Sequence, residues 1–128
     1  MSGLIHKKNK MKLLLGLMLV LWGINIAAVD WQGSTIYDFG DIAKMETSVC
    51  YFYFRNNQSF PITIDNIRTS CGCTAPDWSP LPVQPQALDS IRIEFDAVDV
   101  GYFKKHIKVY FNHQRKAEHL YIEGYVVD

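Results

Sequence analysis

The chain has 128 residues, and its thirteen basic side chains equal its thirteen acidic ones. This length fits one ordinary domain and is too short for two. The charge is uneven along the chain. No acidic residue occurs in residues 1–28, so the remainder has nine Lys/Arg against thirteen Asp/Glu, a net charge of −4. A mildly acidic domain lacks the electrostatic footprint of a nucleic-acid-binding protein.

A targeting segment is predicted over residues 1–28. Four lysines between residues 7 and 12 precede an apolar run at 13–21, and the small residues Ala27 and Ala28 follow. This is the order of a cleaved signal peptide. The alternative is an uncleaved helix over residues 13–29, near the lower limit of about 17 residues for a membrane span. Either form implies export, with the domain in the periplasm, associated with the envelope, or anchored to the inner membrane. Cleavage and the true start, at Met1 or Met11, stay open.

The next part, residues 31–128, is predicted to be one domain of short strands. Apolar and polar residues alternate at 62–65, 91–95, 107–111 and 120–126, which is typical of half-buried strands. Residues 49–54 are continuously apolar or aromatic, with Cys50, Phe52 and Phe54 facing inward by register. A further strand is expected at 35–39. No stretch after residue 30 carries a helical stripe.

Polar turns separate these strands at 56–59, 96–101 and 112–116. Four prolines between residues 76 and 85 mark one long connection, from which we expect strand pairing to be excluded. The pattern predicts an all-β protein, an immunoglobulin-like β-sandwich of about seven strands, preceded by an N-terminal signal or anchor helix.

Residues 69–74 read Thr-Ser-Cys-Gly-Cys-Thr, followed by Pro76 and Trp78. This element resembles the bacterial family called domain of unknown function 1573. Weaker landmarks follow in order at 39–42, 52–56, 101–105, 109–112 and 120–124, so the resemblance covers residues 35–127. It departs from the family where Gln86 follows Pro85, and where Lys44-Met45 replaces a usual glycine. The resemblance implies an immunoglobulin-type sandwich related to Hydin-like domains, in mostly exported or envelope-associated proteins, and no activity.

Cys71 and Cys73 are the first candidate for chemistry. In an extended strand their Cα atoms lie about 6.6–6.8 Å apart, near the upper limit for a disulfide, and Gly72 could bend the chain to close that gap. They are either structural residues, a redox pair or a soft-metal site for Cu(I). The structural interpretation is favoured because no second Cys or His pair at metal spacing and no general base accompanies them. Cys50 is predicted to be a buried free thiol, although pairing with Cys71 or Cys73 stays open.

Tyrosines are the second candidate. They fall on the outward register of their strands, and strands of one sheet would gather them into a single aromatic binding face: Tyr51, Tyr53, Tyr110, Tyr121 and Tyr125. The alternative is cross-strand pairing that stiffens the sheet.

Histidines supply a third candidate. His106 is predicted to face outward from a strand, His113 to lie in a turn and His119 beside a strand start. They are solvated surface residues or, near one hairpin, metal ligands. The sequence contains no nucleophile elbow, no phosphate-binding loop and no zinc-protease motif. We therefore predict no catalytic residue, cofactor or metal.

These observations favour a non-catalytic binding or structural module of the cell envelope. Its partner would be an envelope protein or glycan and not a nucleic acid, with membrane contact only through an uncleaved N-terminal helix. The alternative is a thiol redox or copper-handling protein that uses Cys71 and Cys73. The ligand and the oligomeric state are not predicted.

Overall fold

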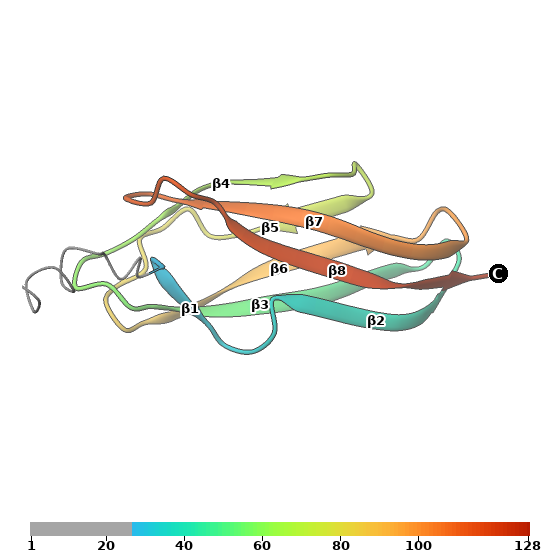
Figure 1. Cartoon of the computed structure of the whole chain (residues 1–128), viewed down its shortest axis with the longest axis horizontal. Helices are drawn as coiled ribbons and strands as arrows, with labels where there is room; N and C mark the ends of the chain where they lie inside the picture. Colours follow the sequence, from blue (N-terminus) through green and yellow to red (C-terminus); the bar gives the residue numbers. More distant parts are fainter. Residues whose placement is uncertain (1–26) are drawn as a thin grey trace, which may run out of the picture.

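The computed structural model describes residues 27–128, which form eight β-strands (Figure 1). The predicted signal segment lies outside the described residues except for Ala27 and Ala28, and the alternative anchor over residues 13–29 overlaps them also at Val29, the first residue of β1. Between residues 27 and 128 there is no helix long and apolar enough to cross a membrane. The strands are β1 (Val29–Trp31), β2 (Ile36–Ala43), β3 (Thr47–Asn56), β4 (Ile64–Thr69), β5 (Thr74–Asp77), β6 (Leu88–Asp96), β7 (Gly101–Phe111) and β8 (Glu118–Val127).

Two four-stranded sheets make up the fold. The first sheet has the order β1-β3-β6-β5 and the second sheet the order β2-β8-β7-β4. All neighbours are antiparallel except β2 and β8, which are parallel, and β2 shifts register between Asp38 and Asp41. The prediction of an all-β sandwich is confirmed, with eight strands where about seven were expected.

Two strands were absent from the sequence prediction. β1 begins at Val29, before the expected domain start at Trp31, and pairs with the end of β3. β5 contains Pro76, which pairs in register with Ile93 of β6. The expectation that this proline lies outside any strand is wrong, because β5 is the last strand of its sheet and an edge strand tolerates a residue without an N–H.

The core lies between the two sheets, and the inward registers read from the sequence are confirmed. Cys50, Phe52 and Phe54 of β3 are all buried. The same holds for the apolar positions of the other predicted strands, namely Ile62, Ile64, Ile91, Ile93, Phe95, Ile107, Val109, Phe111, Leu120, Ile122 and Val126. Phe54 of the first sheet meets Phe111 of the second edge-to-face, with ring centroids 5.4 Å apart. Such contacts join the sheets and leave alternate side chains pointing outward.

Candidate functional site

The five candidate tyrosines do not form a single face. Tyr51 and Tyr53 lie on the outer side of the first sheet, because β3 belongs to that sheet, and their rings stack at 6.2 Å. Tyr110, Tyr121 and Tyr125 lie on β7 and β8 of the second sheet. The prediction of one five-tyrosine surface is therefore wrong. The strand register fixes the side of a sheet on which a residue lies, but not the sheet to which its strand belongs.

A larger group of exposed or half-buried side chains covers the outer side of the second sheet, and we call it the β7–β8 face. It takes one residue from β4, five from β7 and four from β8: Arg68, Tyr102, Lys104, His106, Lys108, Tyr110, His119, Tyr121, Glu123 and Tyr125. These positions repeat every two residues along each strand, as the pleat requires. The face is therefore a consequence of strand register and not of loop geometry.

Aromatic and cation–π contacts pack the tyrosines of this face against neighbouring side chains. Tyr102 and Tyr125 are cross-strand partners with ring centroids 5.8 Å apart, and the Tyr102 hydroxyl donates to Glu123 Oε2 at 3.0 Å. That hydrogen bond to a carboxylate raises the pKa of Tyr102. Lys104 Nζ lies 5.1 Å from the Tyr121 ring centroid. Tyr102 and Tyr125 nevertheless stay 59% and 54% exposed.

A histidine pair occupies the middle of the face. His106 Nε2 and His119 Nδ1 lie 2.6 Å apart, and the other side of the His106 ring stacks on Tyr121 with centroids 4.7 Å apart. Desolvation lowers the pKa of His106, and electrostatic interactions with His119 and Lys108 lower it further. Residues 27–128 contain no group of three or more metal-ligating side chains. The two histidines form a hydrogen-bonded pair, and Lys108 is the register partner of His119.

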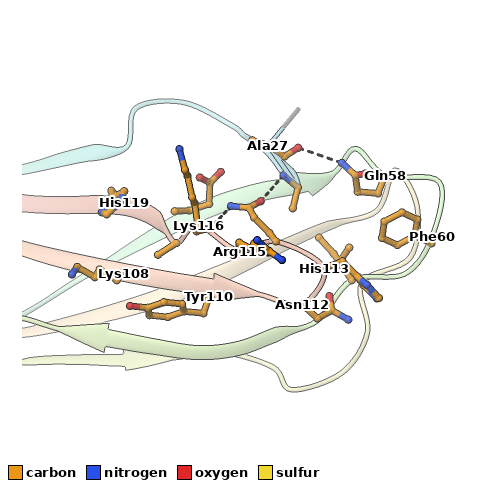
Figure 2. Close-up of a pocket in the computed structure, with 15 residues that line it drawn as sticks. Ala27, Gln58, Phe60, Lys108, Tyr110, Asn112, His113, Arg115, Lys116 and His119 are labelled. Carbon is orange, nitrogen blue, oxygen red and sulfur yellow. Dashed lines mark hydrogen bonds between the residues drawn. The ribbon is translucent and has the colours of Figure 1, made fainter. Parts of the chain in front are cut away.

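A pocket of about 830 Å³ lies at one end of the sandwich (Figure 2). The β7–β8 turn, the loop that carries Gln58 and Phe60, and the first described residues line it. Gln114 holds the segment just before β1 there, because its Oε1 accepts the Ala28 N–H at 2.8 Å.

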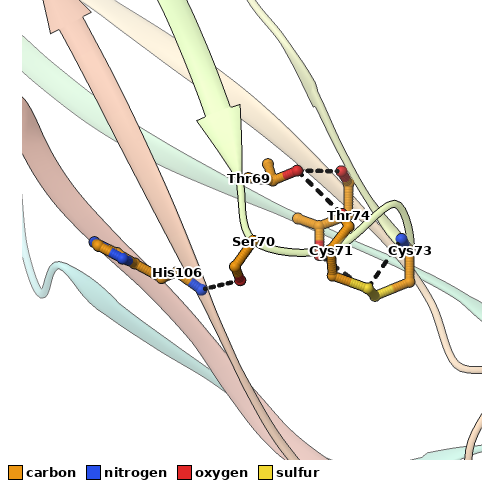
Figure 3. The surroundings of a disulfide bond; sticks show 6 residues. All are labelled: Thr69, Ser70, Cys71, Cys73, Thr74 and His106. Carbon is orange, nitrogen blue, oxygen red and sulfur yellow. Dashed lines mark hydrogen bonds between the residues drawn. A yellow bond between two sulfur atoms is a disulfide. The ribbon is translucent and has the colours of Figure 1, made fainter.

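Cys71 and Cys73 form a disulfide in the turn between β4 and β5, with Cα atoms 5.2 Å apart (Figure 3). The sequence left their pairing open, and the bend at the turn brings them closer than an extended strand would. Thr69 Oγ1 donates within this turn, to the carbonyls of Cys71 and Thr74. In Figure 3 the His106 ring points away from the sulfurs. Among the residues labelled in Figure 3, none is therefore placed beside the disulfide as a general base.

Cys50 is the free cysteine, as the inward register predicted. It is 2% exposed on β3, and burial raises the pKa of its thiol to about 12. A thiol with such a pKa is protonated at neutral pH and is a poor nucleophile. Cys50 therefore acts as a small core residue.

Sequence reasoning missed Arg68, Tyr102 and Lys104. The strand over residues 107–111 was expected to be short, whereas β7 runs from Gly101 to Phe111. Tyr102 and Lys104 share the even-numbered register of Tyr110, so extending the alternation backwards would have found them. Arg68 joins the face only through the pairing of β4 with β7, which is a long-range contact.

Two face-to-face β-sheets, with no helix between residues 27 and 128, define a sandwich of the immunoglobulin-like or PapD-like class. The chain belongs to the family described as "Protein of unknown function (DUF1573)", whose model matches residues 30–126. This match confirms the resemblance drawn from the Cys-Gly-Cys-Thr element. No curated protein matches the chain.

Several solved structures share the fold. A protein of unknown function from Porphyromonas gingivalis W83 is 16% identical with a TM-score of 0.65, and the match covers 80% of this chain and 50% of that one. The chain thus spans half the length of that relative. PapD-like domain 7 of human CEP192 is 10% identical with a TM-score of 0.67, over 79% of this chain and 86% of that one. A family 123 glycoside hydrolase from Clostridium perfringens is 10% identical with a TM-score of 0.67, and the match covers 80% of this chain and 27% of that one. These likenesses show the fold alone.

Proposed function

We propose that the protein is an exported, non-catalytic binding module of the cell envelope, and that the β7–β8 face is its binding surface. The observation that carries the proposal is the ordered set of exposed aromatic and cationic side chains on this face. Tyrosine and arginine are enriched at interfaces because they combine apolar area with a polar end. Rings already packed against their neighbours lose little side-chain entropy on binding, which favours affinity.

The partner is an envelope protein or glycan. A lysine-led apolar segment precedes the sandwich in the sequence, which supports export. The similar domain in a glycoside hydrolase occupies 27% of that chain, which is consistent with a sandwich that serves as an accessory unit of a larger protein. The net charge of −4 after Ala28 disfavours a nucleic-acid partner.

The test compares two matched double variants for co-sedimentation with the organism's own envelope fraction. Tyr102→Ser with Tyr125→Ser removes the exposed pair of the β7–β8 face. Tyr51→Ser with Tyr53→Ser removes a similarly exposed and stacked pair from the opposite outer face. We expect the first variant to lose at least about tenfold in retention and the second to keep the parent's retention.

Equal retention of both variants, or no retention of the parent, would overturn the assignment of the face. Circular dichroism checks that both variants fold. Protease or periodate treatment of the envelope fraction then separates a protein partner from a glycan partner.

Thiol exchange at the Cys71–Cys73 disulfide is a second candidate function, because the bond exists and both residues are partly exposed. A substrate dithiol would give two electrons and two protons to the bond, leaving Cys71 and Cys73 as thiols and the substrate as a disulfide. The test is incubation with reduced thioredoxin, as a dithiol probe, and alkylation of the products. This candidate would be established if the parent oxidises the probe faster than free oxidised glutathione does. A slower rate, together with lower stability of the variant in which both cysteines are replaced by serine, would show that the disulfide is structural.

A further inference from the structure

Two positive charges face each other across the edge of the second sheet. Arg68 of β4 and Lys108 of β7 are register partners, and both side chains are exposed. On its other side Lys108 is the register partner of His119. Like charges directly opposite each other in a sheet are destabilising. Their placement therefore costs stability that a bound anion would restore.

Carboxylates do not offset these charges. Between residues 27 and 128, Arg92 and Glu94 form the salt bridge whose nitrogen–oxygen distance is below 4.0 Å, and both residues lie on the first sheet. Residues 1–26 contain no Asp or Glu at all, so the rest of the chain has no carboxylate side chain to supply. Arg68 and Lys108 are thus balanced only by solvent or by a ligand.

A pocket of about 290 Å³ opens between these two side chains. Its lining is Arg68, Thr69, Ser70, His106, Lys108 and Tyr110. Ser70 Oγ accepts the His106 backbone N–H at 3.1 Å, which leaves the Ser70 hydroxyl hydrogen available to a ligand. The Arg68 guanidinium carbon lies 5.6 Å from the Tyr110 ring centroid, so the arginine is held over an aromatic wall.

We propose that this pocket binds the oxyanion group, a carboxylate or sulfate, of an acidic glycan. The proposal rests on the proposed function, since the pocket lies on the β7–β8 face. Guanidinium forks match planar carboxylates and tetrahedral oxyanions with paired hydrogen bonds. The volume is at the lower end of the roughly 300–1,000 Å³ of small-molecule sites, which suits one charged group. Ser70 and Tyr110 add neutral partners for sugar hydroxyls and an apolar wall for the ring.

Charge distribution favours a glycan over a membrane. Attraction to anionic lipid needs a cluster of about four to eight Lys/Arg, whereas this domain is acidic overall and its pocket holds two basic side chains, Arg68 and Lys108. A lipid surface would meet the repulsion of Glu123 and of the net charge of −4. A single acidic group entering the pocket would meet mainly the charges of Arg68 and Lys108.

The experiment is isothermal titration of the exported protein with trigalacturonate, with sodium sulfate and with neutral maltotriose, at constant ionic strength. Arg68→Gln and Lys108→Gln each remove one pocket charge, and Lys44→Gln removes one exposed charge from the β2–β3 turn as the matched control. We expect trigalacturonate affinity to fall at least about tenfold in both pocket variants and less than about twofold in the control. Thermal melting provides a second readout, because relieving the like-charge contact should leave Tm unchanged or raise it.

If Lys44→Gln loses as much trigalacturonate affinity as the two pocket variants, the binding is general electrostatic attraction and the specific pocket is overturned. Sulfate binding without trigalacturonate binding would overturn the glycan assignment. Binding to phosphatidylglycerol vesicles or to an acidic peptide, lost in the pocket variants and absent for the sugars, would replace the glycan by that partner. If the parent binds no oxyanion while the Tyr102/Tyr125 variant still loses envelope retention, this inference fails and the binding face stands.

Discussion

Asn56 is the fully buried polar side chain around which one end of the sandwich is organised. Its Nδ2 donates to the carbonyls of Phe60 and Val83, both at 2.9 Å. Its Oδ1 accepts the Gln58 N–H at 2.8 Å. One side chain thereby connects the end of β3, the loop after it and the proline-rich connection. Since a buried amide is tolerated only when it is hydrogen-bonded, this position requires asparagine.

Substituting Asn56→Asp should destabilise the fold by about 3–5 kcal/mol at pH 7, because a buried carboxylate would face two carbonyl oxygens with no partner. The control is Asn112→Asp. Asn112 Oδ1 accepts the Thr63 N–H, a role that a carboxylate retains, so its cost should stay below about 1 kcal/mol. Urea unfolding followed by tryptophan fluorescence measures both. Similar losses in the two variants would contradict this account of Asn56.

At the scale of the elements, β2 and β8 approach each other unusually closely. A Cβ at Gly124 of β8 would lie 2.8 Å from the Gly40 carbonyl oxygen and 3.0 Å from the Phe103 ring. Gly40 itself has a φ of +66° within the irregular part of β2, where Asp38 Oδ1 accepts its N–H at 2.8 Å. The parallel pairing of these strands therefore depends on a missing side chain at residue 124.

Gly124→Ala should cost about 1–3 kcal/mol, because backbone and a core ring must move to admit the methyl group. Gly72→Ala is the matched control: nothing lies within 4 Å of its added Cβ, and its φ is not positive. We expect the control to be as stable as the parent or slightly more stable. Chemical denaturation of the two variants decides the point, and a Gly124→Ala protein of parental stability would show that β2 can shift freely.

Strand alternation made the core predictable but not the edge elements. Cys50, Phe52 and Phe54 could be assigned to the interior because they share one register of their strand, whereas the hydroxyl-bearing Tyr51 and Tyr53 occupy the other. β1 is only three residues long, and β5 contains Pro76, so neither has a pattern of its own. Both exist because a neighbouring strand offers free backbone groups, which is long-range information.

For the whole molecule, the sequence predicted a sandwich but could not divide the strands between its two sheets. That division placed Tyr51 and Tyr53 on one outer face and the other three candidate tyrosines on the opposite one. The same long-range pairing opposed Arg68 to Lys108, two residues that are far apart in the chain. Candidate sites formed by residues of one strand could therefore be predicted from the sequence, whereas sites formed by residues of several strands could not.

Four strands have one side unpaired, and each limits the addition of another chain in its own way. β1 is short, β2 is irregular, β5 contains Pro76, and β4 exposes the charged Asp65 and Arg68. Short, interrupted, proline-bearing or charged edges discourage edge-to-edge growth between molecules. These four strands therefore disfavour the edge-to-edge pairing through which β-rich domains of different molecules begin to form fibres.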